Sequence, residues 1–458
     1  MKLAKAAVVA SFRKIPEVRF EDPATTTMTS YAGLVVFQRM FADLNLRTRL
    51  RECFSSQSIS PMIGFDRLTL WLILHITIGY RHLRDSKYYQ MDPMVLRTLD
   101  LRKLPDSSTL SRSIKLLETS SVDRVSALMT EMVADGLRRE SPARLTLDFD
   151  GSVISTSRKA EGVAVGYNPK KKGQRSYYPL FCTVGQTGQF FDMLHRSGNT
   201  HDSNGAQGFA ESCIKKAKSI VPGIKIETRQ DSAFFDEDYL DNLDDQSVEF
   251  TCSVPFERFS ELKSMVQGRC WWRRIDEEWS YFELGWQPKS WDSEYRFIAY
   301  RRRLPKRRQG PLQLELFEPK DFEHDYKVVI TNKRINAKKV LAFHNGRGSQ
   351  EGIFGEAKTD CKLEYVPVRS WEGNRLYCLA AMIAHNMNRE IQMRTSEKDR
   401  GTTEKRTQNW AFEKLSTIRQ KIIQRAGRLI RPQGKLTLVM AADGELQKEI
   451  NRYVQIAA

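Results

Sequence analysis

Two aspartates share one side of a short strand pattern, TLDFDGS (146–152). In an extended chain Asp148 and Asp150 point one way, while the apolar side chains beside them point the other. Two carboxylates on one face, opposite an apolar face, are costly to bury unless a positive group lies between them. The pattern therefore indicates either a site for cations or a strand end that reaches solvent, where aspartate is harmless.

A third aspartate, Asp231, closes a second strand pattern, IKIETRQDSAFF (224–235). Ile224 and Ile226 would face the core, and Asp231 falls on the opposite parity. The alternative is a helix cap, because Asp and Ser followed by apolar residues can start a helix.

The segment FHNGRGSQEGIFGEAK (343–358) places a carboxylate between two cations. On a helix, Glu351 follows Arg347 by one turn and precedes Lys358 by two turns, so the three share a face. His344 lies about one turn ahead of Arg347. The alternative is an ordinary helix with an i,i+4 ion pair, which contributes about 0.3–0.5 kcal/mol.

Glu356 competes with Glu351 for the same role. It lies about 140° further around the helix, so the two cannot face the same metal ions. The stretch also holds several glycines, each costing about 1 kcal/mol in a helix. That cost favours close approach of another backbone, such as DNA, or a helix that begins later. The glycines are Gly346, Gly348, Gly352 and Gly355.

These carboxylates suit phosphodiester chemistry with two metal ions. Mg²⁺ favours carboxylate oxygens together with phosphate and water. Two ions about 3.5–4 Å apart can activate the attacking oxygen and stabilise the leaving one. Arg347 or Lys358 could hold a phosphate beside the ions.

The charge balance of the chain points to a polyanionic partner. Lys and Arg number 73 against 56 Asp and Glu, for a formal net charge of +17. Such an excess is most simply explained by nucleic acid. The alternative is a basic surface without such a partner.

The cysteines and the apolar runs bear on the compartment. Seven scattered cysteines without a CxxC pair argue against a disulfide framework or a structural zinc site, and favour a reducing cytoplasm. The apolar run in MKLAKAAVVASFRKIPE (1–17) is too short for a usual signal peptide. The sequence has no run of 18 or more apolar residues, and it therefore predicts no membrane span.

Helices are predicted over residues 1–140. FDRLTLWLILHITIGYRHL (65–83) has the composition of a buried core helix. LPDSSTLSRSIKLLE (104–118) begins with capping residues, and Arg112 and Lys115 would lie on its outer face. That arrangement is typical of a DNA-reading helix and equally of any solvated helix.

The aspartates lie in an α/β pattern. Strands are predicted over 144–156 and 224–235, a hairpin over 177–198 and a helix over 202–219. This order of strand, hairpin, helix and strand brings the two acidic strands into one sheet.

A β-rich insertion is predicted over residues 248–332, which include the basic run YRRRLPKRR (300–308). Beyond it, residues 333–395 are predicted to be helical. IRQKIIQRAGRLIR (418–431) predicts an amphipathic basic helix in which Arg425 and Arg428 would contact DNA. Five of the eight tryptophans lie in the insertion: Trp271, Trp272, Trp279, Trp286 and Trp291.

The order strand-Asp, strand-Asp, helix-Glu resembles the RNase H-like DDE transposases of bacterial insertion sequences. The helix is similar to the signature Y-x2-R-x3-E-x6-K of one branch: Arg347, Glu351 and Lys358 stand at its spacing, and His344 replaces the Tyr. The blocks LDFDGS, RQDSAFF and QEGIFGEAK most resemble the insertion-sequence family thirteen-eighty. The resemblance covers residues from about 144 to 395.

The resemblance implies which acids act. It favours Asp150 over Asp148 as the first catalytic residue, because Gly and Ser follow it, and it adds Asp231 and Glu351. These three would hold two Mg²⁺ ions, for which Mn²⁺ can substitute, and Asp148 would lie close enough to share them. In that branch the Tyr and Arg of the signature contact a DNA phosphate, which gives His344 and Arg347 that role here, with His344 as the departure.

The resemblance also implies a fold and a function. It predicts an α/β protein: an RNase H-like core interrupted by the β-rich insertion, with an N-terminal helical domain and a C-terminal helical region. A tryptophan of the insertion would stack on a flipped base if a DNA hairpin forms. The regions expected are a DNA-binding domain (1–140), the core (144–247), the insertion (248–332), the rest of the core (333–395) and a basic C-terminal region (396–458).

The function expected is a DNA transposase. It would cleave double-stranded DNA at the terminal inverted repeats of a mobile element and join the 3′ ends to target DNA, as a homodimer in the bacterial cytoplasm beside the nucleoid. One alternative is a two-metal nuclease without strand transfer. Another is a transposase-derived DNA-binding protein without catalysis, against which the costly cluster of carboxylates argues.

Overall fold

The computed structural model describes residues 19–22, 25–59, 61–166, 168, 171–200, 204–304, 324–441 and 444–455. The apolar run near the N-terminus and the end of the basic run 300–308 therefore lie outside the described residues. Within the described part, none of the helices combines the length and apolar character that crossing a membrane requires.

The N-terminal part is built from helices that pack around one apolar core. As predicted, the apolar segment from residue 65 forms a buried helix, α4. It ends at Thr77 rather than at residue 83, because Gly79 has a φ of 109° and the Arg419 guanidinium donates to the Thr77 carbonyl. The helices are α2 (Leu34–Asp43), α3 (Leu46–Cys53), α4 (Phe65–Thr77), α5 (Pro93–Leu99), α6 (Ser107–Ile114) and α7 (Thr119–Glu140), with a 3₁₀ turn η1 (Leu83–Tyr88).

Helix α6 begins as its sequence predicts. The Asp106 side chain accepts a hydrogen bond from the Thr109 amide at 2.8 Å, which caps the helix. Leu110 and Ile114 are fully buried, and Arg112 is exposed. The amphipathic pattern of this segment therefore predicted correctly which of these residues face the core and which face solvent.

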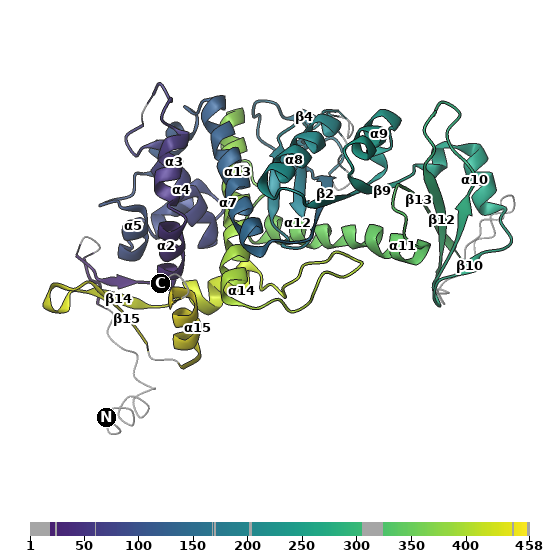
Figure 1. The fold of residues 1–458 in the computed structure, drawn as a ribbon. Coiled ribbons are helices and arrows are strands. Elements are labelled where there is room, and N and C mark those ends of the chain that lie inside the picture. The colour runs from purple at the N-terminus through teal and green to yellow at the C-terminus, as the bar shows by residue number, and fades with distance from the viewer. Residues whose placement is uncertain are drawn as a thin grey trace, which may run out of the picture.

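A mixed sheet extends from the middle of the molecule to one of its ends (Figure 1). Among the described residues it has nine strands in the order β10-β11-β12-β13-β9-β8-β2-β6-β7. Strand β8 is parallel to β2 and β9, and the other pairs are antiparallel. The strands are β2 (Arg144–Gly151), β6 (Leu180–Val184), β7 (Phe190–Leu194), β8 (Lys225–Gln230), β9 (Glu249–Ser253), β10 (Arg273–Arg274), β11 (Trp279–Leu284), β12 (Arg296–Arg303) and β13 (His324–Thr331).

One face of this sheet is apolar and the other is polar. Leu145, Leu147 and Phe149 of β2 are fully buried in the core that includes α8 (Ala206–Ile220) and α9 (Glu237–Asp245). The alternation of apolar and polar residues predicts this arrangement. The opposite, polar face carries Asp148 and Asp150.

The strands predicted as an insertion extend the central sheet. Strand β9 pairs with β8 on one side and with β13 on the other. Because these ladders are continuous, the acidic strands and the tryptophan-rich strands share one sheet. The same part of the chain contains a short helix, α10 (Ser260–Gln267), and a 3₁₀ turn, η3 (Phe256–Arg258).

The structure does not form a single helix over 343–358 and instead bears out the alternative of a helix that begins later. The chain forms α11 (Ala337–Asn345), a 3₁₀ turn η4 (Gly346–Gly348) and then α12 (Ser349–Thr359). A Cβ on Gly346 would lie 1.9 Å from the Lys405 carbonyl oxygen. Close approach of a backbone does explain this glycine, but the backbone belongs to the chain itself.

A long buried helix, α13 (Trp371–Thr395), joins the two halves of the molecule. It packs against α4 and α7 of the N-terminal helices. Its Asn386 side chain donates to the Phe190 carbonyl of β7 at 2.7 Å and accepts from the Phe190 amide at 2.8 Å. Helix α13 therefore fixes the edge of the sheet to the helical part.

The basic helix predicted over 418–431 is wrong. Helical structure ends at Ile423, and Arg428 lies in strand β14, paired with Met28 of β1. This pairing satisfies backbone groups that a helix would have satisfied within itself. The C-terminal part is thus mixed rather than helical: α14 (Leu415–Ile418), a π-helical turn η5 (Arg419–Ile423), β14 (Gly427–Ile430), β15 (Thr437–Met440) and α15 (Gly444–Gln455), with β1 (Met28–Thr29).

A small sheet lies between β2 and the hairpin of β6 and β7 in the sequence. It is formed by β3 (Ile154–Ser155), β4 (Ala164–Val165) and β5 (Arg175–Tyr177) in the order β3-β5-β4. The remaining short elements are the 3₁₀ turns η2 (Ser232–Phe234) and η6 (Pro432–Gly434).

The contact at Gly346 can be tested against its neighbour Gly348. Gly346→Ala should lower the free energy of unfolding by about 3 kcal/mol, because a methyl group there collides with backbone. Gly348→Ala should raise it by about 0.5–1 kcal/mol, because Gly348 is helical and no atom lies within 4 Å of its Cβ position. Urea unfolding followed by circular dichroism measures both. Equal changes in the free energy of unfolding for the two variants would contradict the packing of residue 405 on η4.

Candidate active site

A buried ion pair organises the polar face of the sheet. Arg229 of β8 lies beside Asp148 of β2 in the parallel register, and both side chains are essentially without exposure. The guanidinium donates through Nε to Asp148 Oδ1 at 2.6 Å and through Nη2 to Oδ2 at 2.5 Å. Both carboxylate oxygens therefore accept from Arg229, and the metal role expected for Asp148 stays a prediction.

Asp150 has a different environment from Asp148. Its side chain is 25% exposed, and its Oδ2 lies 3.4 Å from Nη1 of Arg347. Arg347 belongs to the turn η4, so this contact joins the end of β2 to the junction of α11 and α12. Of the two aspartates, Asp150 is the one that a solvated cation can approach.

Asp231 comes directly after β8. The parallel ladder between β2 and β8 ends at the pair Asp148 and Arg229, and Asp150 and Asp231 each lie two residues beyond this pair, at the ends of adjacent strands. The Asp231 side chain accepts from the Ala233 amide at 3.0 Å and starts the turn η2. The helix-cap alternative therefore describes this residue, and its role in an active site stays a prediction.

Glu351 lies in the first turn of α12, next to a residue that anchors the helix. The Gln350 side chain is buried and donates to the Asp148 carbonyl at 3.0 Å. Glu351 itself is exposed. The helix start is thus fixed over β2, with Glu351 on its open side.

The donor chemistry of these residues fits a hard cation. Asp150 and Asp231 offer carboxylate oxygens at neighbouring strand ends, and both are partly exposed. The charge of Arg347 occupies the position beside Asp150 in this structure. Among the described residues, however, no three His, Cys, Asp or Glu side chains come together closely enough to hold a metal ion. Glu351 is therefore near the same helix junction but not grouped with the two aspartates.

His344 does not occupy a surface position. It is 3% exposed, and its ring nitrogens lie 3.1 Å from Thr251 Oγ1 and 3.0 Å from Ser253 Oγ. Burial, together with the charges of Lys327 and Arg347, holds the pKa of His344 well below its usual value. In this structure the imidazole ring is enclosed and hydrogen-bonded to two hydroxyl groups, and the DNA contact expected of His344 stays a prediction.

Glu356 is a structural residue. It is 5% exposed, forms an ion pair with Arg389 of α13 and accepts from the Leu415 amide at 3.2 Å. Burial raises its pKa in spite of Arg389. It faces the helical core, whereas Glu351 is exposed, as the helical angle between them predicts.

The sequence patterns did not single out a second buried acid, Glu227. Glu227 of β8 accepts from Lys333 Nζ at 2.7 Å, from Arg144 Nη1 at 3.0 Å and from Arg406 Nε at 2.8 Å. Burial raises the pKa of Glu227, but the Arg406 hydrogen bond and the Lys333 charge outweigh it and lower the pKa to about 2. The alternation of Glu227, Arg229 and Asp231 could have revealed a polar strand face.

A half-buried lysine, Lys327 of β13, also lies near the site. Its Nζ donates to the Asn345 side chain at 2.9 Å, and burial and the charge of Arg347 lower its pKa. Two cations thus lie near the junction of α11 and α12. No periodic feature of the sequence singles this lysine out.

The other residues predicted to bind DNA lie on separate elements. Arg112 and Lys115 are exposed at the end of α6, and Lys358 is partly exposed near the end of α12. Arg425 Nε donates to the Lys421 carbonyl at 2.8 Å, which holds it against its own turn. Arg428 is exposed on β14, 3.5 Å from Glu21.

Comparison with known proteins gives the family of the chain. No curated protein matches it. Among solved structures, it is similar to the piggyBac transposase in a synaptic complex with hairpin DNA, with 12% identity, a TM-score of 0.44, and coverage of 78% of this chain and 74% of that chain.

Two Mos1 transposase structures are similar over shorter lengths. The paired-end complex with the left transposon end has 10% identity and a TM-score of 0.18, and the mariner paired-end complex with Mn has 11% and 0.17. Each match covers 34% of this chain and 52% of that chain. The family model described as transposase DDE domain, group 1, matches residues 17–457, and the chain therefore belongs to this family of DDE transposases.

Proposed function

We propose that this chain cleaves DNA at the terminal inverted repeats of a mobile element and joins the 3′ ends to target DNA. The observation that carries the proposal is the pair Asp150 and Asp231 at adjacent strand ends, beside the helix start that bears Glu351. Phosphodiester cleavage and transfer need such carboxylates around divalent ions. Because the chain belongs to a family of DDE transposases, we infer that the reaction is DNA transposition.

An RNase H-like core fits the order of elements around this pair. Strand β2, the hairpin of β6 and β7, helix α8 and strand β8 follow one another, and β2 and β8 lie side by side. Helix α12 then returns over β2 with Glu351. We also infer that the chain belongs to the insertion-sequence branch whose blocks it resembles, and that a dimer acts on two element ends.

Divalent metal ions, Mg²⁺ or Mn²⁺, would be held by Asp150 and Asp231 with Glu351 as the third ligand. Bound ions would activate the attacking oxygen and stabilise the leaving oxygen. Arg347 and Lys327 supply positive charge beside the aspartates, where a backbone phosphate can be held. Asp148 contributes by holding Arg229 and the strand register.

The different roles of the two aspartates can be separated by measurement. Asp148→Asn should lower the free energy of unfolding by about 3–5 kcal/mol, because it leaves the charge of Arg229 buried and unpaired. Asp150→Asn should change it by less than about 1 kcal/mol and should abolish Mn²⁺ binding measured by electron paramagnetic resonance. Retention of Mn²⁺ binding by Asp150→Asn would contradict the assignment of Asp150, rather than Asp148, as a metal ligand.

Catalysis should depend on the second and third acids. Asp231→Asn and Glu351→Gln should abolish cleavage of a duplex that carries the flanking inverted repeat, while binding of that duplex stays within a few fold. Asp238→Asn, which neutralises an exposed acid in the first turn of α9, is the matched control and should cleave normally. Full cleavage by either site variant would remove that residue from the mechanism.

A nuclease without strand transfer is the alternative that shares this site. Incubation of the wild-type protein with Mg²⁺, a pre-cleaved repeat end and a plasmid separates the two functions. Joined products support the transposase. Cleavage of uncut ends without any joined product would favour the nuclease, and DNA binding without cleavage would favour a non-catalytic protein.

Trp271 is the tryptophan of the β-rich segment that fits a role in base stacking. It is 62% exposed, whereas Trp272, Trp286 and Trp291 belong to or pack against the apolar core, and Trp279 packs beside β12. An exposed indole stacks on a base with about 1–3 kcal/mol.

Trp271→Ala should therefore reduce the fluorescence increase of 2-aminopurine placed at the repeat end, while the unfolding midpoint stays unchanged because the indole is exposed. Trp286→Ala, which removes a core contact with Phe297, should instead lower the unfolding midpoint. Normal 2-aminopurine fluorescence with Trp271→Ala would exclude this tryptophan.

A further inference from the structure

A hollow of about 300 Å³ opens where the N-terminal helices meet the loops that follow the acidic elements. Four segments contribute to it: the start of η1, helix α6, the loop after β3, and the segment between α12 and α13. The lining residues are His82, Leu83, Arg84, Ser107, Ser111, Arg158, Tyr365 and Pro367. The hollow therefore joins the helical part to the part that carries the proposed active site.

The hollow is positive. Arg84 and Arg158 are exposed cations, and none of the eight described residues that line it is acidic. The acids directly beside lining residues in the sequence already have partners: Asp85 accepts from the His82 amide at 3.1 Å, Asp106 caps α6, and Glu364 lies 3.7 Å from Arg81. An anion that enters the hollow would therefore meet arginines without a competing carboxylate on its wall.

Tyr365 is held by cationic neighbours. The guanidinium groups of Arg81 and Arg158 lie 5.3 Å and 6.0 Å from its ring centre, and the His82 ring meets it edge-on at 5.0 Å. Arg158 Nη2 also donates to the Tyr365 hydroxyl at 3.5 Å. A ring with these neighbours has little room for a stacked base, which favours a phosphate as the ligand.

Helix α6 supplies hydroxyl groups on the same wall. Ser107 and Ser111 are one turn apart, so they share the face of α6 that meets the hollow. Ser107 lies in the first turn, where the helix dipole favours an anion. Arginine, serine and tyrosine side chains are among the groups that contact the sugar-phosphate backbone of DNA.

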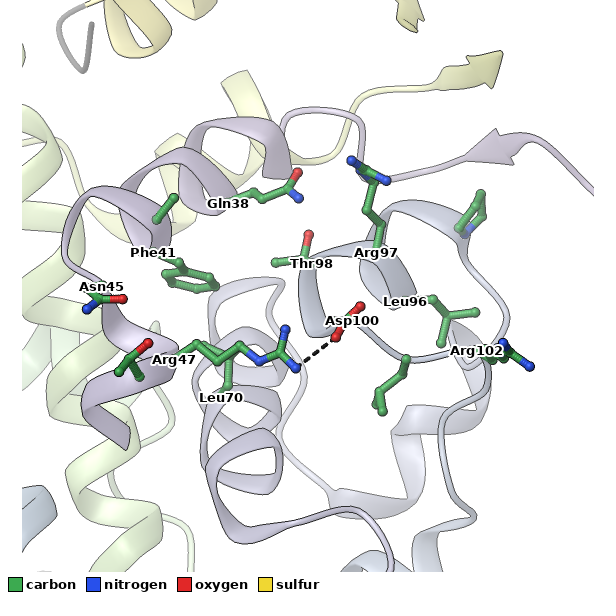
Figure 2. Close-up of a pocket in the computed structure, with 14 residues that line it drawn as sticks. Gln38, Phe41, Asn45, Arg47, Leu70, Leu96, Arg97, Thr98, Asp100 and Arg102 are labelled. Atoms are coloured by element: carbon green, nitrogen blue, oxygen red, sulfur yellow. Dashed lines mark ion pairs between the residues drawn. The ribbon is translucent and has the colours of Figure 1, made fainter. Parts of the chain in front are cut away.

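A second hollow shows what a less suitable site looks like (Figure 2). It has about 850 Å³ and is lined by residues of α2, α3, α4 and α5. There Arg47 points to Asp100 at 2.8 Å, and Arg67 lies 3.4 Å from the same carboxylate. The wall of this hollow carries Asp100 as well as Arg47, Arg97 and Arg102, so an anion there would lie beside a carboxylate, which the wall of the smaller hollow does not have among its described residues.

We propose that the hollow between α6 and Tyr365 binds one phosphate of the DNA backbone. Arg84 and Arg158 would pair with the phosphate, and Ser107, Ser111 and the Tyr365 hydroxyl would donate to it. This inference rests on the proposed function, because it takes DNA as the ligand. The phosphate would position α6 on the DNA and set the distance from that point to the acidic strand ends.

The test uses the full chain and a fluorescein-labelled duplex of the inverted repeat that flanks the coding region. Binding is followed by anisotropy over a series of salt concentrations. Arg84→Ala and Arg158→Ala should each weaken binding, and the double variant should reduce the salt slope by about 0.9, the value for one lost phosphate contact. Lys87→Ala and Lys159→Ala are matched controls, because they remove the same charge from exposed neighbours outside the hollow.

A scan with neutral methylphosphonate linkages locates the phosphate. One linkage should weaken binding of the wild-type protein about tenfold and leave binding of the double variant unchanged. Equal losses for control and hollow variants, or a scan in which both proteins respond alike at every linkage, would overturn the hollow as a phosphate site. Failure of the wild-type protein to bind the repeat duplex at all would instead overturn the proposed function.

Discussion

The buried pair of Asp148 and Arg229 is the interaction on which the polar face of the sheet depends. Arg229 satisfies both oxygens of Asp148 and also donates to the Phe343 and Lys405 carbonyls at 3.2 Å and 2.6 Å. It thereby ties together two strands, the end of α11 and the loop before α14. A buried pair adds little net stability, but loss of one partner is costly. The arrangement of these four segments is therefore coupled to a single guanidinium group.

The loop between α13 and α14 completes this polar layer. The Arg406 guanidinium donates to the Glu227 carboxylate, and the Lys405 carbonyl accepts from Arg229. The Asn409 amide donates to the Gln186 carbonyl at 2.9 Å. In Figure 1 the loop extends beneath α12. It supplies cations and carbonyls to a sheet face whose own side chains include two buried acids. Without it, Glu227 would lose one of its three cationic partners.

Charge is divided unequally along the same strands. Near one end of β8, three cations pair with Glu227; burial raises its pKa, but two of these cations, Arg406 and Lys333, lower it to about 2. At the other end, Asp150 and Asp231 are partly exposed, and Arg347 lies beside Asp150. Within the sheet, the charge of Glu227 is thus neutralised by neighbouring cations. At the strand ends, the carboxylates of Asp150 and Asp231 stay partly accessible to solvent. This gradient suits the proposed site, which would exchange metal ions and DNA phosphates with solvent.

The sequence by itself determined which residues face which side. Alternation in β2 and β8 and the cap of α6 follow from local periodicity and short-range hydrogen bonds, and the structure agrees with them. The acidic pattern also indicated the DDE transposase family, which the family model confirms. The roles of Asp150, Asp231 and Glu351 stay predictions.

Only the tertiary structure decided what each polar residue does on its face. Asp148 and Asp150 are equivalent in a strand pattern, and Arg229, far away in sequence, separates them. Gly346 interrupts the helix because residue 405 packs on it, and Arg428 enters a strand because Met28 pairs with it. The role of an ionisable or backbone group is set by the partner that neutralises it. That partner is distant in the chain, so local periodicity cannot identify it.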